Sequence, residues 1–242
     1  MRNIVDILGI PIDKITMRIA VDTLVQSIIK YEHKYVCTPN SEILYAAQED
    51  GELKTALREA DMLVADGIGV VWASRILGTP LPERVAGFDL MLNMLAKANE
   101  MRLKVFLFGA APGVAEQTKA TILYNYPDVK IVGVENGYDY HEDPEAIIEK
   151  INNVEPDILF VALGAPTQEK WLYRNNDRIL SKVSIGVGGS FDILAGNKKR
   201  APEIMQKLGL EWLYRLVQQP SRYKRVMELP KFIALVLKNR SR

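Results

Sequence analysis

Residues 156–187, PDILFVALGAPTQEKWLYRNNDRILSKVSIGV, decide the fold class of this 242-residue chain. Residues 158–163 and 183–187 are apolar runs rich in β-branched side chains, and residues 168–178 between them have the length and composition of a helix. Neither run alternates with polar residues, so we expect both faces of each strand to be covered. A strand, a helix and a strand in this order predict a parallel β–α–β unit.

The same alternation extends in both directions along the chain. We predict an α/β fold, a Rossmann-like and mostly parallel sheet with helices on both faces, preceded by a hairpin at 4–13. Thr16 and Ser41 are expected to cap the first two helices. The remaining strands are expected at 35–38, 62–65, 104–108 and 130–134. The remaining helices are expected at 16–31, 41–60, 68–77, 88–100, 114–126 and 144–153.

After residue 197 the pattern contains helices only. We expect Pro220 and Pro230 to separate them, because proline interrupts the hydrogen bonds of a helix interior. The chain is therefore divided into an α/β body with its N-terminal hairpin, residues 1–197, and a helical basic appendage, residues 198–242. The expected helices of the appendage are 202–219, 221–229 and 230–239.

The composition is that of an ordinary globular protein, with 48% hydrophobic and 25% charged residues. The single cysteine, Cys37, excludes an intrachain disulfide and favours a reducing compartment. Two histidines far apart in sequence exclude a His-rich zinc site. No apolar run approaches the roughly 20 residues of a spanning helix, and the N-terminus lacks the apolar segment of a signal peptide. We expect a protein on the cytoplasmic side that does not span the membrane.

The net charge of +1 conceals an uneven distribution of charge. Residues 198–242 hold 12 Lys or Arg against 3 Asp or Glu, a balance of +9, whereas residues 1–197 hold 19 basic and 27 acidic side chains, a balance of −8. An acidic body with a basic appendage predicts an anionic partner, which is a membrane surface, a nucleic acid or a phosphorylated substrate. The alternative is a solvated charged tail.

Small and polar residues gather where the predicted strands end. In an open parallel sheet, ligands bind outside the carboxyl ends of the strands. Glycines there let a ligand approach the backbone, and the next helix offers free N–H groups to a phosphate. These loops predict a site for a nucleotide diphosphate; the alternative is that the glycines only form tight turns. The candidate residues are Thr38, Asn40, Asp66, Gly109, Glu135, Tyr138, Gly164, Gln168, Gly188, Gly189 and Asp192.

Several known nucleotide motifs are absent from the sequence. There is no G-x-x-x-x-G-K-[ST], and GAAPG at 109–113 does not match G-x-G-x-x-G, which argues against a P-loop ATPase and weakens an NAD site. There is also no Asp-x-Asp pair to bridge a divalent metal and a diphosphate. We therefore expect no cofactor and no metal, with N–H dipoles and arginines neutralising the diphosphate instead.

Asp66 is the candidate general base. It ends the apolar run 62–65, and partial desolvation at a strand end suits a carboxylate that takes a proton from a hydroxyl. The alternative is an Asp-Gly turn. Thr38 and Asn40 offer a hydroxyl and an amide that could orient a sugar, with turn formation or helix capping as the alternative. Gln168 either caps a helix or contacts the ligand, and Cys37 is interpreted as a small buried hydrophobe.

Basic and aromatic side chains are mixed in the appendage. Such helices lie on anionic bilayers, and the same residue types bind single-stranded nucleic acid. The apolar run FIALVL at 232–237 favours lipid. The alternative is a helix docked on the body or on another subunit. The residues are Trp212, Tyr214, Arg215, Arg222, Tyr223 and Arg225.

Five stretches together resemble the WecG/TagA/CpsF glycosyltransferase family, and the resemblance covers nearly the whole chain. The last two are specific. They are RVAGFDL (84–90), VFLFGAAPGVAEQ (105–117), GVENGYDY (133–140), PDILFVALGAPTQEKWL (156–172) and IGVGGSFDILAGNKKRAPEIMQKLGLEWLYRLVQQPSRYKR (185–225).

The resemblance implies an inverting, metal-independent glycosyltransferase that is peripheral on the inner face of the cell membrane. The chain is most similar to TagA-type members. These transfer N-acetylmannosamine from UDP to undecaprenyl-diphosphate-linked N-acetylglucosamine, making the β-1,4 disaccharide of the wall teichoic acid linkage unit. Other members use the uronic acid form of that sugar or other hexoses.

The resemblance also assigns roles to residues of this sequence. Its implied catalytic residues are Asp66, Thr38, Gln168 and Arg84. Its implied substrate-binding residues are Asn40, Arg215, Arg222 and Arg225.

Two other function classes are weighed against the transferase. A Rossmann-type oxidoreductase lacks the G-x-G-x-x-G motif, and a nucleic-acid-binding module would leave the FIALVL run without a use. The expected partners are a UDP-sugar donor, a lipid-diphosphate-linked N-acetylglucosamine acceptor and an anionic membrane surface. We expect no nucleic acid, and a homo-oligomer is left open.

Overall fold

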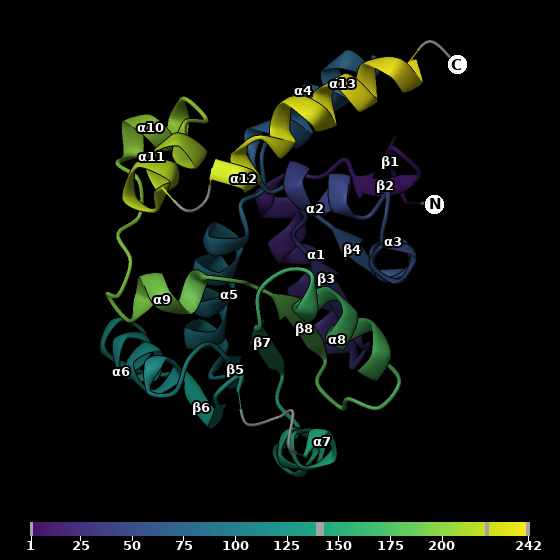
Figure 1. Cartoon of the computed structure of the whole chain (residues 1–242). Helices are drawn as coiled ribbons and strands as arrows, with labels where there is room; N and C mark the ends of the chain where they lie inside the picture. The colour runs from purple at the N-terminus through teal and green to yellow at the C-terminus, as the bar shows by residue number, and fades with distance from the viewer. Residues whose placement is uncertain (1, 139–142, 221–222, 241–242) are drawn as a thin grey trace.

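The core of the protein is a six-stranded parallel sheet (Figure 1). The computed structural model describes residues 2–138, 143–220 and 223–240. Across the sheet the strands are β4 (Met62–Leu63), β3 (Lys34–Cys37), β8 (Val183–Gly186), β7 (Ile158–Ala162), β5 (Lys104–Gly109) and β6 (Lys130–Glu135). Beside it lies the antiparallel hairpin of β1 (Ile4–Ile7) and β2 (Ile10–Asp13). The predicted fold class is confirmed.

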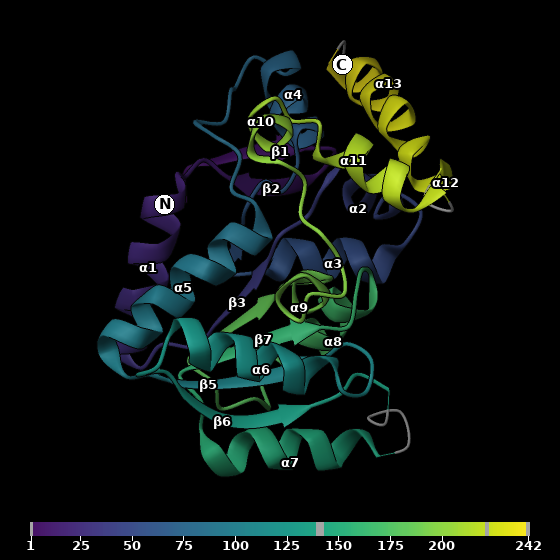
Figure 2. The ribbon, with the colours of Figure 1, turned by 90° about the vertical axis from the view of Figure 1, so that its left-hand side faces the viewer.

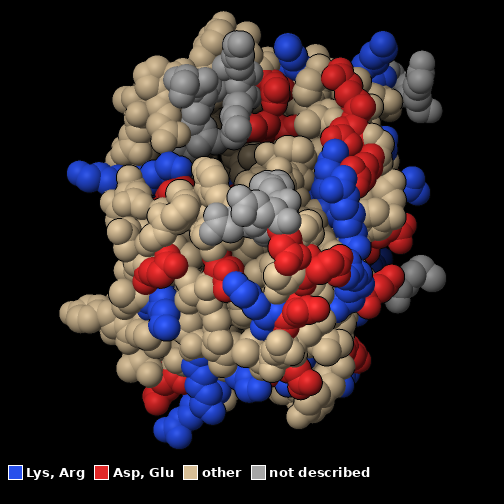
Figure 3. Space-filling model, turned by 60° about the horizontal axis from the view of Figure 1, so that its bottom comes forward, with Lys and Arg blue, Asp and Glu red and all other residues tan. Residues whose placement is uncertain are grey.

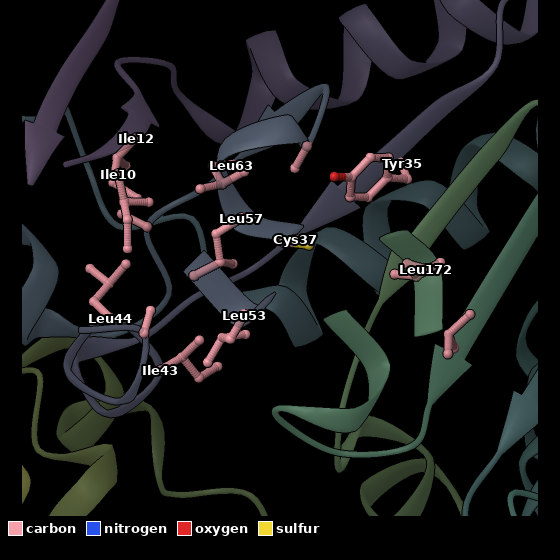
Figure 4. Packing of buried hydrophobic residues seen from close by; sticks show 14 of the residues in the cluster. Ile10, Ile12, Tyr35, Cys37, Ile43, Leu44, Leu53, Leu57, Leu63 and Leu172 are labelled. Carbon is pink, nitrogen blue, oxygen red and sulfur yellow. The ribbon is translucent and has the colours of Figure 1, made fainter. Parts of the chain in front are cut away.

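Helices cover both faces of the sheet (Figure 2). Along β3, Tyr35 and Cys37 belong to one buried cluster and Val36 to the other, which explains why the strand has no polar alternation. Figure 4 shows side chains of the first cluster from β2, β3, β4 and the neighbouring helices. On that face lie α2 (Ser41–Ala46), α3 (Gly51–Glu59), α7 (Pro144–Val154) and α8 (Thr167–Asn175). On the opposite face lie α1 (Met17–Lys30), α5 (Gly87–Met101), α6 (Val114–Asn125) and α9 (Ser190–Leu194).

The segment predicted as one helix over 41–60 forms two helices, α2 and α3. Asn40, rather than Ser41, caps α2, because its Oδ1 accepts a hydrogen bond from the Ile43 N–H at 2.9 Å. Asp50 caps α3 by accepting from the Leu53 N–H at 3.0 Å. A side-chain oxygen that bonds nearby backbone N–H groups favours a new helix start over continuation of the old helix. Thr16 caps α1 as predicted.

Two shorter helices bear on the site. α4 (Ile68–Ile76) follows Gly67 and lies where a helix is predicted. α9 is short and falls in a segment predicted as a loop. Its five residues follow two glycines, and so short a helix leaves no periodicity to detect.

The appendage contains α10 (Glu203–Lys207), α11 (Glu211–Gln218), α12 (Tyr223–Val226) and α13 (Glu228–Arg240). The helix predicted over 202–219 is interrupted at Gly209, whose φ of +72° is incompatible with a continuing helix. A Cβ on Gly209 would lie 2.9 Å from Ile68 Cγ1, so this turn packs closely on α4. Pro230 lies in the first turn of α13 and does not separate two helices. The N–H groups of a first helical turn have no partner within the helix, so a proline is tolerated there.

The apolar run at 232–237 does not lie free for a bilayer as expected. Phe232 and Val236 are fully buried and belong to the same cluster as the hairpin and α3. α13 packs against α2 and α4, and Figure 1 shows it beside α4. The docked-helix alternative holds for these side chains, because the body supplies an apolar surface for them. Within the described residues, no helix is both long and apolar enough to cross a bilayer.

Candidate active site

A cleft of about 650 Å³ opens at the carboxyl ends of the strands. It arises because the chain leaves β8 toward α9 on one face, whereas it leaves the neighbouring strands β3 and β7 toward α2 and α8 on the other. Predicted residues that line it are Thr38, Asn40, Asp66, Tyr138, Gly164, Gln168, Gly188, Gly189 and Asp192. Figure 3 shows a hollow in one face, with acidic and basic side chains interspersed around it.

Thr38 is buried at the end of β3. Its Oγ1 donates a hydrogen bond to the Gly186 carbonyl at 3.2 Å, which joins the ends of β3 and β8. A Cβ on Gly87 would lie 2.8 Å from the same hydroxyl oxygen. The first residue of α5 must therefore be small for Thr38 to keep its position, which gives the RVAG segment a structural reason for its glycine.

Asp66 stands between two cavities. It follows β4 and is half-buried, and its backbone N–H donates to the Pro39 carbonyl at 3.1 Å, which holds it beside the end of β3. Asn40 lines the same two cavities while its side chain caps α2. Asn40, and not Ser41 as we expected, therefore caps α2. Only the side-chain oxygen of Asn40 takes part in that hydrogen bond.

Gln168 is buried in the first turn of α8. Its Oε1 accepts a hydrogen bond from the Gly188 N–H at 2.9 Å, and its Nε2 donates to Glu169 Oε1 at 2.9 Å. The side chain thus connects α8 to the loop after β8. Gly188 has a φ of +52°, a conformation that favours glycine and turns this loop toward the cleft.

Gly109 and Glu135, both predicted site residues, line neither this cleft nor the smaller cavity described below. Gly109 packs on β7, where a Cβ would come within 2.5 Å of the Ala162 backbone. Glu135 is paired with Lys150, with 2.7 Å between its Oε1 and the ammonium nitrogen. Both positions end strands, but the first serves strand packing and the second faces α7.

Arg84 lies at a second, smaller cavity of about 110 Å³. Its Nη1 is 3.3 Å from Glu211 Oε2 in α11, and both side chains are largely buried. Trp212 also lines this cavity, and its indole Nε1 is buried without a hydrogen-bond partner among the described residues. The wall therefore combines the body, including Asp66, with the appendage.

The appendage reaches the main cleft through residues that sequence reasoning did not select. Gln218 and Gln219, Lys198 and Lys199 all line it. Lys198 is paired with Asp192, at 2.6 Å. The run of basic residues at 198–200 could have indicated the two lysines. No sequence feature indicated the two glutamines.

The structure describes the three predicted C-terminal arginines to different extents. Arg222 lies outside the described residues. Arg215 and Arg225 have described backbones in α11 and α12, and their side chains are outside the description.

Metal donors do not gather in the described part of the chain. Over 2–138, 143–220 and 223–240, no group of three or more His, Cys, Asp or Glu could hold an ion. Desolvation raises the pKa of the Cys37 thiol well above its ordinary value, and this cysteine is fully buried as predicted.

A parallel sheet with glycine loops and a polar cleft at its carboxyl edge is the arrangement of α/β enzymes that bind ligands beyond the strand ends. Residues 5–242 match the glycosyl transferase WecG/TagA/CpsF family. The chain belongs to this family and is a glycosyltransferase.

Curated relatives carry one common name, N-acetylglucosaminyldiphosphoundecaprenol N-acetyl-beta-D-mannosaminyltransferase. The Bacillus subtilis (strain 168) protein is 40% identical over 84% of this chain and 78% of its own length. The Bacillus spizizenii protein is 38% identical over 85% and 79%, respectively. The Staphylococcus aureus (strain MRSA252) protein is 36% identical over 97% and 92%.

Proposed function

We propose that this enzyme transfers N-acetylmannosamine from UDP to undecaprenyl-diphosphate-linked N-acetylglucosamine, with inversion and without a metal ion. The relatives' shared name supports the acceptor and the transferred sugar. The observation that carries the mechanism is the position of Asp66, which lines two cavities at once. The product of this transfer is the linkage disaccharide of wall teichoic acid.

The larger cleft is the proposed donor site. Its volume of about 650 Å³ is within the usual range for small-molecule sites. Backbone at Gly164, Gly188 and Gly189 lines it, and backbone N–H groups can bind the diphosphate. Lys199 lies in the same wall. Gln218 and Gln219 line the cleft from the segment that also carries Arg215 and Arg222, which supports a role for the C-terminal arginines in binding the departing UDP.

The smaller cavity is the proposed approach of the acceptor sugar. Inversion requires the attacking hydroxyl to arrive on the face of the anomeric carbon opposite the UDP, so the acceptor and the UDP lie on opposite sides of that carbon, with Asp66 on the side of the acceptor. Asp66 takes the proton from that hydroxyl as its oxygen bonds to the anomeric carbon. The bond from that carbon to the phosphate oxygen breaks, and UDP leaves with the electron pair.

The appendage is the proposed membrane contact. Ile204, Leu208 and Val217 in and beside α10 and α11 are 72%, 65% and 73% exposed. Exposed apolar side chains on a segment with a balance of +9 fit an anionic bilayer surface. We place the protein on the inner face of the cell membrane, with 1–197 as the catalytic body and 198–242 as the membrane-associating part.

A panel of UDP-sugars with a short-chain lipid-diphosphate N-acetylglucosamine acceptor tests this function. We expect transfer from UDP-N-acetylmannosamine in EDTA, and a product whose β anomeric configuration is shown by NMR. Preference for another UDP-sugar would overturn the donor. Activity that disappears in EDTA and returns with Mg²⁺ or Mn²⁺ would overturn the metal-independent mechanism.

A further inference from the structure

Glu169 is a buried carboxyl group that the proposed mechanism does not use. It is 1% exposed, in the first turn of α8, and it does not line the cleft. Its Oε1 accepts a hydrogen bond from Gln168 Nε2 at 2.9 Å. Its Oε2 is buried without a hydrogen-bond partner among the described residues. A buried polar atom of this kind needs an explanation, because leaving it unpaired costs stability.

The contacts of Gln168 depend on which way its amide points. The oxygen accepts from the Gly188 N–H, and the nitrogen faces Glu169. A Cβ on Gly186 would lie 3.0 Å from this nitrogen, so the amide lies against the end of β8. Rotating the amide by 180° would put a nitrogen donor opposite the Gly188 donor and lose both hydrogen bonds.

Two side-chain hydrogen bonds, one from the end of β3 and one from α8, meet at this end of β8. Thr38 Oγ1 bonds the Gly186 carbonyl, and Gln168 Oε1 bonds the Gly188 N–H. Gly188 lines the donor cleft. The position of this loop is therefore fixed from one side by Thr38 and from the other by the Glu169 and Gln168 pair.

Burial disfavours the charged form of Glu169. Desolvation raises the pKa of Glu169, and the hydrogen bond from Gln168 only partly opposes this. In either protonation state the carboxyl of Glu169 offers the oxygen that accepts from Gln168 Nε2.

We propose that Glu169 is a positioning residue for the donor site: it fixes the orientation of the Gln168 amide, which holds the loop at Gly188 in place for the diphosphate or sugar. This proposal rests on the proposed function only because that function identifies the ligand that the loop binds. Glutamine at 169 keeps the accepting oxygen and the shape, whereas leucine keeps the approximate volume and removes the acceptor.

The test compares Glu169→Gln, Glu169→Leu and a matched control, Asn175→Ala. Asn175 is a buried polar side chain on the same helix, bonded to the Trp171 carbonyl and outside the cleft lining. UDP affinity is measured by calorimetry, and kcat and KM are measured for the donor. We expect Glu169→Leu to weaken UDP binding and raise the donor KM about tenfold, the effect of losing one buried hydrogen bond. Glu169→Gln should stay within about twofold of wild type, and Asn175→Ala should alter stability alone.

Hydrogen exchange of the ligand-free protein separates this proposal from the proposed function. Glu169→Leu should speed exchange of the Gly188 amide by about tenfold, and Glu169→Gln should leave it unchanged. This readout holds even if the enzyme uses another sugar nucleotide. Unchanged exchange and UDP affinity in Glu169→Leu would overturn the positioning role. An equal loss in Glu169→Gln would overturn the claim that an accepting oxygen at position 169 is sufficient.

Discussion

Arg84 and Glu211 join the body to the appendage through an ion pair with 3.3 Å between Nη1 and Oε2. The side chains are 18% and 13% exposed, and both line the cavity that contains Asp66. A residue assigned to catalysis by resemblance thus also fixes the first turn of α11. Any change at either position affects docking of the appendage as well as the chemistry.

Reversing this ion pair separates the two roles. Arg84→Glu and Glu211→Arg should each lower the free energy of unfolding by about 2 kcal/mol, since each leaves two like charges together in a partly buried site. The double reversal should recover most of that stability in chemical denaturation while transfer stays low, because the guanidinium is then carried by the appendage wall of the cavity instead of the body wall. Full recovery of turnover in the double variant would show that Arg84 acts through docking alone.

Phe232 tests the docked position of α13. Phe232→Ala should lower the free energy of unfolding by about 3–5 kcal/mol, because a fully buried phenyl ring is lost from the main cluster. Leu237→Ala, at a half-exposed position of the same helix, should cost less than about 1 kcal/mol. Equal effects in denaturant titrations would contradict the packing. Truncation before Lys231 should destabilise the body for the same reason.

Membrane binding should depend on the exposed apolar residues of the appendage. A triple variant with Ile204, Leu208 and Val217 changed to Ser should bind anionic vesicles at least about tenfold more weakly in flotation, since each loses apolar burial in lipid. UDP affinity should be unchanged. Ile29→Ser, at an exposed position of α1, is the control. If the triple variant floats as well as this control, the bilayer contacts another surface.

Gly87 tests the position of Thr38. Gly87→Ala places a Cβ 2.8 Å from the Thr38 hydroxyl oxygen, so that side chain must shift, and we expect kcat to fall about tenfold. Gly51→Ala is the control, because a Cβ there meets nothing within 4 Å. Steady-state kinetics measure kcat for both variants. Equal kcat values would show that Thr38 needs no exact placement.

The sheet could be predicted from the sequence because its strands other than the edge strand β6 are buried on both faces. Uninterrupted apolar runs, each followed by glycine or a polar turn, identify such strands without knowledge of their neighbours. Helix ends were less predictable. Asn40 and Ser41 are adjacent and chemically able to cap the same helix, and only the folded backbone selects Asn40.

The docking of the appendage on the body could not be predicted from the sequence. An apolar run such as 232–237 has the same pattern whether it contacts lipid or α2 and α4, so its burial requires tertiary structure. The cleft residues at strand ends were accessible to sequence reasoning because parallel topology brings those ends together. Glu211 and Glu169 were not. Glu211 pairs with Arg84, which is distant in sequence. Glu169 contacts Gln168 without lining the cleft itself.

Single-turnover kinetics of Asp66→Asn test the central claim most directly. Asparagine keeps the shape of the side chain between the two cavities but cannot accept the acceptor's proton. The account predicts a transfer rate lower by about 10²–10⁴, with UDP affinity and unfolding midpoint close to wild type. A near wild-type transfer rate when chemistry limits the reaction would contradict the assignment of Asp66 as the general base.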